Sequence, residues 1–374
     1  MRPSWLARPW ITAVFAVWWT GGAAPLAPVP PAGVPPEQPA AVYLAPENPA
    51  VLLQMDAAMR EYFDQRVSLR QPSAEVLEAI VAAIIRPAGL GFAYDGVGTF
   101  DAGETFRRRR GNCLSFALLV TAVARHYGFK TTFQNVDRTG QWDRVGDIIT
   151  TVQHVNVRVE TLSEIYVLDL RPDLVPVAGR QTATTVTDER LFALFYNDVG
   201  IGHLMQGRPA EARRALELAT QIDPRCASIW ANRATLHARF GELTLARSAY
   251  ERSLQLDRQG LNALVGFVSV LKQLGTPGDL RLAGELERRA QQVQDRNPYY
   301  HQHLAQLAQE KGDWQGADKH LRRAIALKED APEFYEQWIV TLQHLGREEA
   351  AQRATTRLAK LRQRLAERPA RIMP

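Results

Sequence analysis

Cys113 is the residue of this chain that best suits nucleophilic chemistry. It lies in the stretch Gly-Asn-Cys-Leu-Ser at 111–115, at the start of an apolar run and directly after four arginines at 107–110. A nucleophilic thiol needs a lowered pKa and a base within hydrogen-bond reach. At a helix N-terminus the helix dipole and the free N–H groups favour a thiolate and an oxyanion. The alternatives are a buried, inert cysteine and, for the arginines, a solvated turn.

His154 is the histidine that the sequence predicts as the base. Six of the eight histidines lie in the C-terminal part of the chain, which leaves His126 and His154. His126 shares the predicted helix of Cys113, thirteen residues further on. A rise of about 1.5 Å per residue puts it roughly 20 Å away, so it is excluded. His154 lies instead within an alternating, strand-like stretch, TVQHVNVRV.

Asp169 is the carboxylate expected to orient that histidine. It is embedded in the apolar stretch IYVLDL at 165–170, and an aspartate in such a strand is costly without a partner. Asp173 is the alternative, although its place after Arg-Pro favours a turn. Candidates for an oxyanion-hole side chain are Asn112, Gln134 and Tyr94.

The elements that must position these residues form an α+β region. Apolar spacing and capping residues predict helices at 49–65, 73–85 and 112–127. Strands are predicted at 131–136, 151–159 and 165–170, with a polar loop at 137–147. Helices followed by an antiparallel set of strands are typical of this fold class.

This order of residues resembles the transglutaminase-like branch of the papain-like superfamily over about residues 45–190. The shared features are Gly-Asn-Cys opening an apolar helix, a histidine on a strand and an aspartate on the next strand. The resemblance implies that Cys113 is the nucleophile, His154 the general base and acid, and Asp169 the orienting residue. It implies acyl transfer through a thioester, to water in a peptidase or amidase, or to an amine in a cross-linking enzyme. The chain departs from the family after the histidine, where Val-Asn-Val replaces an aromatic residue.

From residue 195 to about 365 the sequence predicts only helices and contains a repeat. Glycines recur at 34-residue steps, at 207, 241 and 275 and again at 312 and 346. This period resembles the tetratricopeptide repeat (TPR), in which stacked helix pairs share a continuous core. About five units are expected, the third irregular, with a short tail at 366–374. The resemblance implies a protein or peptide partner held on the concave surface.

The N-terminus reads as an export signal followed by a linker. Arg2 and Arg8 precede an apolar core, WITAVFAVWW, and small residues follow at 21–24. Residues 1–24 are therefore expected to be a signal peptide, with an uncleaved membrane anchor as the alternative, and 25–44 a proline-rich tether. The product would be periplasmic or secreted. The two cysteines, Cys113 and Cys226, exclude a disulfide framework, and Cys226 is expected to serve packing.

The composition is that of a soluble protein, with 46% hydrophobic and 23% charged residues and a net charge of +5. No metal-ligand spacing, P-loop or dinucleotide fingerprint is present, so neither a metal nor a nucleotide cofactor is expected, and nucleic acid is not an expected partner. Two hypotheses follow. The first is an exported cysteine-dependent acyl-transfer enzyme whose repeats bind protein. The second is a non-catalytic interaction scaffold that keeps a degenerate transglutaminase-like region.

Overall fold

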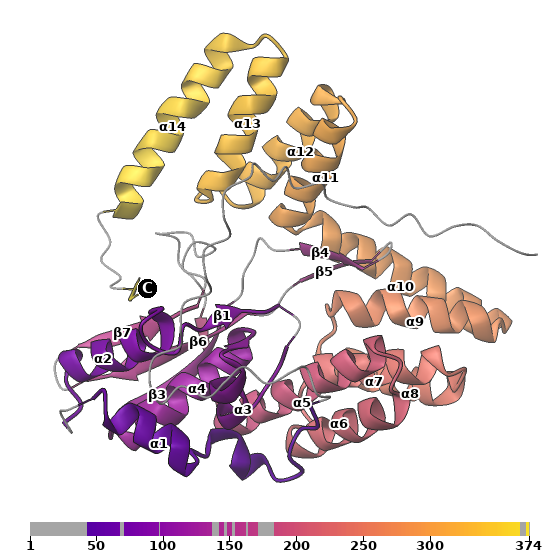
Figure 1. Cartoon of the computed structure of the whole chain (residues 1–374). Helices are drawn as coiled ribbons and strands as arrows, with labels where there is room; N and C mark the ends of the chain where they lie inside the picture. Colours follow the sequence, from indigo (N-terminus) through magenta and orange to yellow (C-terminus); the bar gives the residue numbers. More distant parts are fainter. Residues whose placement is uncertain are drawn as a thin grey trace, which may run out of the picture.

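An N-terminal α/β region is followed in this chain by a curved array of helices, α5 to α14 (Figure 1). The computed structural model describes residues 43–67, 71–96, 98–136, 142–145, 148–151, 154–161, 164–170, 183–366 and 372–373. The expected export signal at 1–24, nearly all of the linker and Asp173 lie outside the described residues. None of the helices in the described part of the chain is both long and apolar enough to cross a membrane.

The first helical segment is divided in two, where the sequence predicts one helix at 49–65. The 3-10 helix η1 (Pro49–Leu53) is followed by α1 (Ala57–Asp64). Asp56 separates them, because its carboxylate accepts a hydrogen bond from the backbone N–H of Met59 and so caps α1. The prediction of a continuous helix is therefore wrong here. The next helix, α2 (Ala74–Ile85), begins behind its predicted cap, Ser73.

Two further helices lead into the sheet. Asp101 caps α3 (Ala102–Arg108), a helix that the sequence did not predict, and Asn112 caps α4 (Cys113–His126), which begins where the sequence predicts a helix. Between them, the two-residue strands β1 (Ala93–Tyr94) and β2 (Arg110–Gly111) pair in parallel. Eleven of the residues of α4 are buried, so this helix forms the centre of the N-terminal core.

One small, mainly antiparallel sheet packs against α4. Its strand order is β8-β3-β6-β7-β9, and only β7 and β9 run parallel. The sequence missed the edge strands β8 and β9. It also missed the hairpin of β4, which lies in the predicted loop at 137–147, and β5, which follows that loop. The strands are β3 (Lys130–Val136), β4 (Trp142–Val145), β5 (Ile148–Thr151), β6 (His154–Glu160), β7 (Ile165–Leu168), β8 (Ala183–Val186) and β9 (Ile372–Met373).

The C-terminal half consists of tetratricopeptide-type helical hairpins. All five glycines of the 34-residue pattern adopt positive φ, between 68° and 74°, and each lies where the first helix of a pair ends, a position that favours glycine. Four helices of the repeats, α6, α10, α11 and α13, begin with a proline. The helices are α5 (Asp188–Met205), α6 (Pro209–Ile222), α7 (Ala227–Arg239), α8 (Leu243–Leu256), α9 (Leu261–Leu274), α10 (Pro277–Asp295), α11 (Pro298–Glu310), α12 (Trp314–Leu327), α13 (Pro332–His344) and α14 (Glu348–Ala366).

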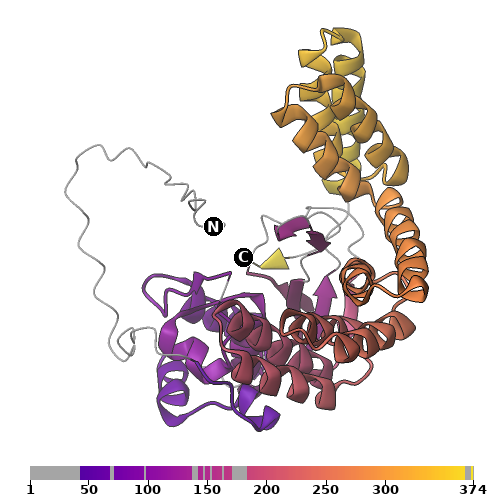
Figure 2. The same ribbon diagram turned by 90° about the vertical axis from the view of Figure 1, so that its right-hand side faces the viewer.

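The first repeat is packed into the N-terminal region. One core cluster joins residues of α1, α2, α4 and the sheet with buried residues of α5, including Leu191 and Phe195. An ion pair between Arg125 on α4 and Asp188 at the start of α5 adds to this junction. From there the helices curve round in an arc, and the β4–β5 hairpin lies inside the arc, in contact with α9 and α11 (Figure 2). The N-terminal region thus closes one end of the concave side of the array.

Candidate functional site

Cys113 is the first residue of α4, and its side chain is partly exposed. The cap that precedes it is tightly held. Asn112 accepts a hydrogen bond from Ser115 N–H at 3.1 Å and donates from its amide to Thr99 Oγ1 at 2.7 Å. The cap therefore also ties the segment at 98–100 to the start of α4, and it fixes the position of Cys113 relative to that segment.

Ser115 makes the second connection between that segment and α4. Its side chain is fully buried, and its hydroxyl accepts from Phe100 N–H at 2.8 Å and lies 3.2 Å from Gly98 O. Gly111 must be a glycine for a related reason. A Cβ on Gly111 would meet Ser115 Oγ at 2.7 Å, nearer than real Cβ atoms approach. The Gly-Asn-Cys-Leu-Ser stretch is thus held by close packing on both sides of the cysteine.

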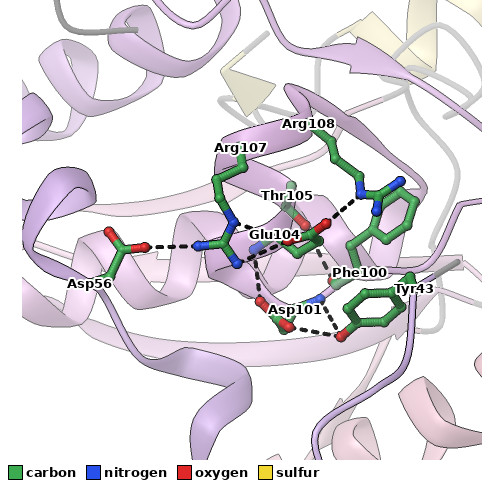
Figure 3. A network of polar contacts seen from close by, with 8 residues as sticks. All are labelled: Tyr43, Asp56, Phe100, Asp101, Glu104, Thr105, Arg107 and Arg108. Carbon is green, nitrogen blue, oxygen red and sulfur yellow. Dashed lines mark hydrogen bonds and ion pairs between the residues drawn. The ribbon is translucent and has the colours of Figure 1, made fainter. Parts of the chain in front are cut away.

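The four arginines at 107–110 are not the solvated turn that the sequence suggested. Arg107 and Arg108 form the last turn of α3, and both bind Glu104, at 2.9 and 2.6 Å (Figure 3). Burial opposes ionisation of Glu104, but hydrogen bonds from Arg108 and Arg107 outweigh it and lower the pKa of this carboxyl. Arg109 ends the helix with φ of 54°, a left-handed conformation uncommon outside glycine.

The same network fastens the start of the described chain to α3. Tyr43 donates to the carboxylate of Asp101 at 2.8 Å and accepts from its N–H at 3.2 Å, and Arg107 reaches Asp56 at 2.9 Å (Figure 3). Burial, reinforced by the charge of Asp101, raises the pKa of Tyr43 far above its ordinary value. The arginines therefore hold α3 in place, and α3 in turn supports the turn before Cys113.

His154 and Asp169 lie in contact with each other. Both carboxylate oxygens of Asp169 are 2.8 Å from His154 Nε2, and both residues are buried, at 5% and 3% exposure. Asp169 follows directly after β7 instead of lying inside a strand. Because a carboxylate accepts hydrogen bonds, Nε2 is the protonated nitrogen of a neutral His154, and Nδ1 is then the basic one. The catalytic roles assigned to both residues stay a prediction.

The relation of this pair to Cys113 follows from the alternation of β6. Val155, Val157 and Val159 belong to the core that includes α4. Since successive side chains of a strand point to opposite faces, His154 and Asn156 start on the other face of β6. His154 is the first residue of the strand. His126, the histidine excluded as the base, lies at the other end of α4, with its Nε2 3.7 Å from Asp64 Oδ1.

A cavity of about 340 Å³ opens at Cys113 and continues between the N-terminal region and the repeats. Leu114 and Val155 contribute the N-terminal wall, and residues from α5, α7 and the start of α9 form the opposite wall. This volume is at the lower end of the range of small-ligand sites, about 300–1,000 Å³. Among the described residues that line it, Cys113 is the only one of the three predicted site residues.

Asp198, which the sequence did not indicate as a site residue, lines this cavity from α5. Burial raises the pKa of Asp198 to about 6, although a hydrogen bond from Asn197 opposes this shift. The signal was present in the sequence as an Asn-Asp pair inside the apolar stretch LFALFYNDVGIGHL. Such a pair on an otherwise apolar helix face is costly unless it is hydrogen-bonded or functional.

The other predicted features are distributed as follows. Tyr94 is 48% exposed on β1, and Gln134 lies on β3 opposite Asn156. Neither these two nor Asn112 is among the described residues that line the cavity. Cys226 is buried and caps α7 by position, with its sulfur 3.3 Å from Ser228 Oγ. Within the described residues, no group of three or more His, Cys, Asp or Glu side chains is placed to hold a metal ion.

Comparisons with known proteins support the repeats. The tetratricopeptide repeat family matches residues 227–259, which span α7 and α8. No curated protein matches the chain in sequence. Similar solved structures include a MamA protein, with 15% identity over 50% of this chain and 100% of that one and a TM-score of 0.27.

Two further solved structures are also similar to part of this chain. One is pilF of Pseudomonas aeruginosa, with 19% identity over 46% of this chain and 77% of that one and a TM-score of 0.26. The other is YrrB, described as a TPR protein with an unusual peptide-binding site, with 13% identity over 45% and 86% and a TM-score of 0.26. The family match and the five left-handed glycines identify the C-terminal half as tetratricopeptide repeats. Such repeats imply a protein or peptide partner.

Proposed function

We propose that this chain is an exported, cysteine-dependent acyl-transfer enzyme of the transglutaminase-like type. We further propose that its repeats hold a protein or peptide substrate next to the thiol of Cys113. The cavity at Cys113 is the observation that carries the proposal. Its walls come from both halves of the chain, so a segment bound along the concave side of the repeats would pass the thiol. The helix N-terminus supplies N–H groups suited to an oxyanion.

In the proposed reaction, Cys113 Sγ attacks an amide carbonyl while its proton passes to Nδ1 of His154. The carbon–nitrogen bond breaks, the amine leaves with that proton, and a thioester remains on Cys113. Water or a second amine then attacks the thioester and restores the thiol. The 2.8 Å contacts between His154 and Asp169 support the orienting role assigned to this carboxylate.

The second candidate is an interaction scaffold without turnover. It is favoured by the alternation of β6, which starts His154 on the face away from α4, and by the lining of the cavity, which includes Val155 but not His154. In this case the His154–Asp169 pair would be a structural pair that stabilises the sheet, and the repeats would carry the function alone.

Alkylation of Cys113 by iodoacetamide at pH 7 distinguishes the two candidates. The enzyme predicts that Cys113 reacts at least tenfold faster than glutathione, and that His154→Gln and Asp169→Asn remove most of this acceleration. His126→Gln is the matched control, because that histidine lies at the far end of α4. The buried Cys226 provides a slow internal reference. A wild-type rate at or below that of glutathione supports the scaffold and contradicts the enzyme.

Export is a separate part of the proposal and rests on the sequence at 1–24. Expression of the full chain in a Gram-negative host, followed by fractionation and N-terminal sequencing, tests it. A mature N-terminus close to residue 25 in the periplasmic fraction is expected. Retention of the intact N-terminus in the membrane fraction would favour the anchor instead, and an intact chain in the cytosol would contradict export.

A further inference from the structure

We propose that the cavity at Cys113 binds a lysine side chain of the partner protein, with the ammonium group held by Asp198. This proposal deepens the proposed function, on which it rests for the chemistry at Cys113, by naming the group that the cavity recognises. The binding itself does not depend on turnover, so the two proposals can fail separately.

The charge of the cavity wall is the first argument. Its titratable groups, among the described lining residues, are Asp198, Asp257 and the thiol of Cys113, and none of these lining residues is a lysine, arginine or histidine. The rest of the wall is apolar, small or amide-bearing. A cavity with two carboxylates and no basic residue in its wall attracts cations and repels anions.

The environment of Asp198 is the second argument. Asn197 is its hydrogen-bond donor, at the long distance of 3.4 Å, and no charged neighbour contributes to the shift in its pKa. Burial without a counter-charge therefore raises the pKa of Asp198 to about 6. A cation that entered the cavity would supply the missing counter-charge and relieve this unfavourable burial.

A chain of side-chain amides orients Asp198 across two repeats. Asn232 on α7 donates to Asn197 Oδ1 at 2.8 Å, and Asn197 in turn donates to Asp198 Oδ1. The carboxylate is thus supported on one side by α7, which leaves its other oxygen as the acceptor for a ligand. A preorganised acceptor of this kind binds a charged donor without a free-energy cost for rearranging the site.

The apolar part of the wall favours lysine over a smaller cation. Leu114, Val155 and Leu194 line the same cavity. A lysine has a flexible four-carbon stem that packs on apolar surface while its compact ammonium group reaches a carboxylate. The site therefore fits a lysine in an extended peptide segment that lies along the first repeats, with its side chain directed to Asp198.

Peptide titration by calorimetry tests the proposal. Three pentapeptides are used, with four alanines around a central lysine, norleucine or glutamate, and each is titrated into the full-length Cys113→Ser chain at pH 7.5. The lysine peptide is expected to bind at least tenfold more tightly than the norleucine peptide, and the glutamate peptide more weakly still. Asp198→Asn should abolish the preference for lysine. Glu189→Gln, which removes the same charge from an exposed position of α5 outside the cavity, should leave it intact.

Equal affinity for lysine and norleucine, or no binding of the lysine peptide, would overturn the proposal. Retention of the preference in Asp198→Asn would overturn it as well. The three-peptide comparison needs no substitution at Asp198, so it remains decisive if that variant does not fold. Lysine selectivity in a chain whose Cys113 is not activated would reject the enzyme but keep this binding site.

Discussion

Removal of two different hydroxyl groups from α4 should change the stability of the fold in opposite directions. Ser115 and Thr121 are both fully buried on this helix. Ser115 Oγ accepts from Phe100 N–H at 2.8 Å, whereas Thr121 Oγ1 has no hydrogen-bond partner among the described residues. The variants Ser115→Ala and Thr121→Val each remove one hydroxyl from the same core, so they are matched controls for each other.

The expected magnitudes follow from these contacts. Ser115→Ala leaves the buried N–H of Phe100 without its acceptor, which costs about 1–3 kcal/mol. Thr121→Val replaces an unsatisfied buried hydroxyl by a methyl group of nearly the same size, which should stabilise the fold by about 1 kcal/mol. At about 2–4 °C per kcal/mol for a unit of this size, Tm should fall by about 2–12 °C in Ser115→Ala and rise by about 2–4 °C in Thr121→Val.

Thermal melts of the full chain followed by near-UV circular dichroism would measure both shifts. A Tm of Ser115→Ala equal to that of the wild type would refute the role given to this hydroxyl in holding the segment at 98–100. A fall in Tm of Thr121→Val as large as that of Ser115→Ala would show that the hydroxyl of Thr121 is satisfied, and it would refute the contrast between the two positions.

Four further substitutions test other parts of the structure. Because the pKa of Asp198 is raised to about 6, the folded chain binds this proton more tightly than the unfolded chain, and stability falls as pH rises from about 4 to 6. Asp198→Asn should therefore be more stable than the wild type at pH 7.5, by at most about 3 kcal/mol, and the difference in Tm should vanish below about pH 4; a difference independent of pH would contradict this. Gly275→Ala places alanine at φ of 72° and should lower the free energy of unfolding in urea by about 1–2 kcal/mol. Gly284→Ala, at an open position inside α10, should raise it by up to about 1 kcal/mol. Equal changes in the two variants would contradict the left-handed cap at Gly275. Leu118→Ala, at a fully buried site on α4, should cost about 2–5 kcal/mol in the same assay, and a loss below about 1 kcal/mol would show that α4 is not the centre of the core.

Local signals in the sequence were sufficient for most helices. Ser73 and Asn112 each cap a helix that was predicted to begin there, whereas α3, which Asp101 caps, was not predicted. Capping and apolar spacing act within a few residues, so a single sequence contains the information. The split at Asp56 was missed because a second capping residue lay inside an otherwise continuous apolar pattern.

Side-chain partners across the fold were harder to predict. The sequence suggested that His154 and Asp169 belong together, and they do lie in contact, but it could not reveal which face of β6 carries the histidine relative to α4. The arginines at 107–110 looked like an exposed run, yet Arg108 is only 9% exposed and pairs with Glu104. Such outcomes depend on the packing of distant elements, which local pattern does not encode.

The sequence by itself determined the helical repeats and the placement of Cys113 at the start of a central helix. The glycine period recurs along the chain, and the Gly-Asn-Cys stretch carries its own cap, so both are local in origin. Only the tertiary structure decided that α5 joins the core of the N-terminal region, and that Cys113 and Asp198, 85 positions apart in the chain, share one cavity. That cavity exists because the repeat array curves back against the sheet and α4, and the meeting of two surfaces is a property of the assembled fold.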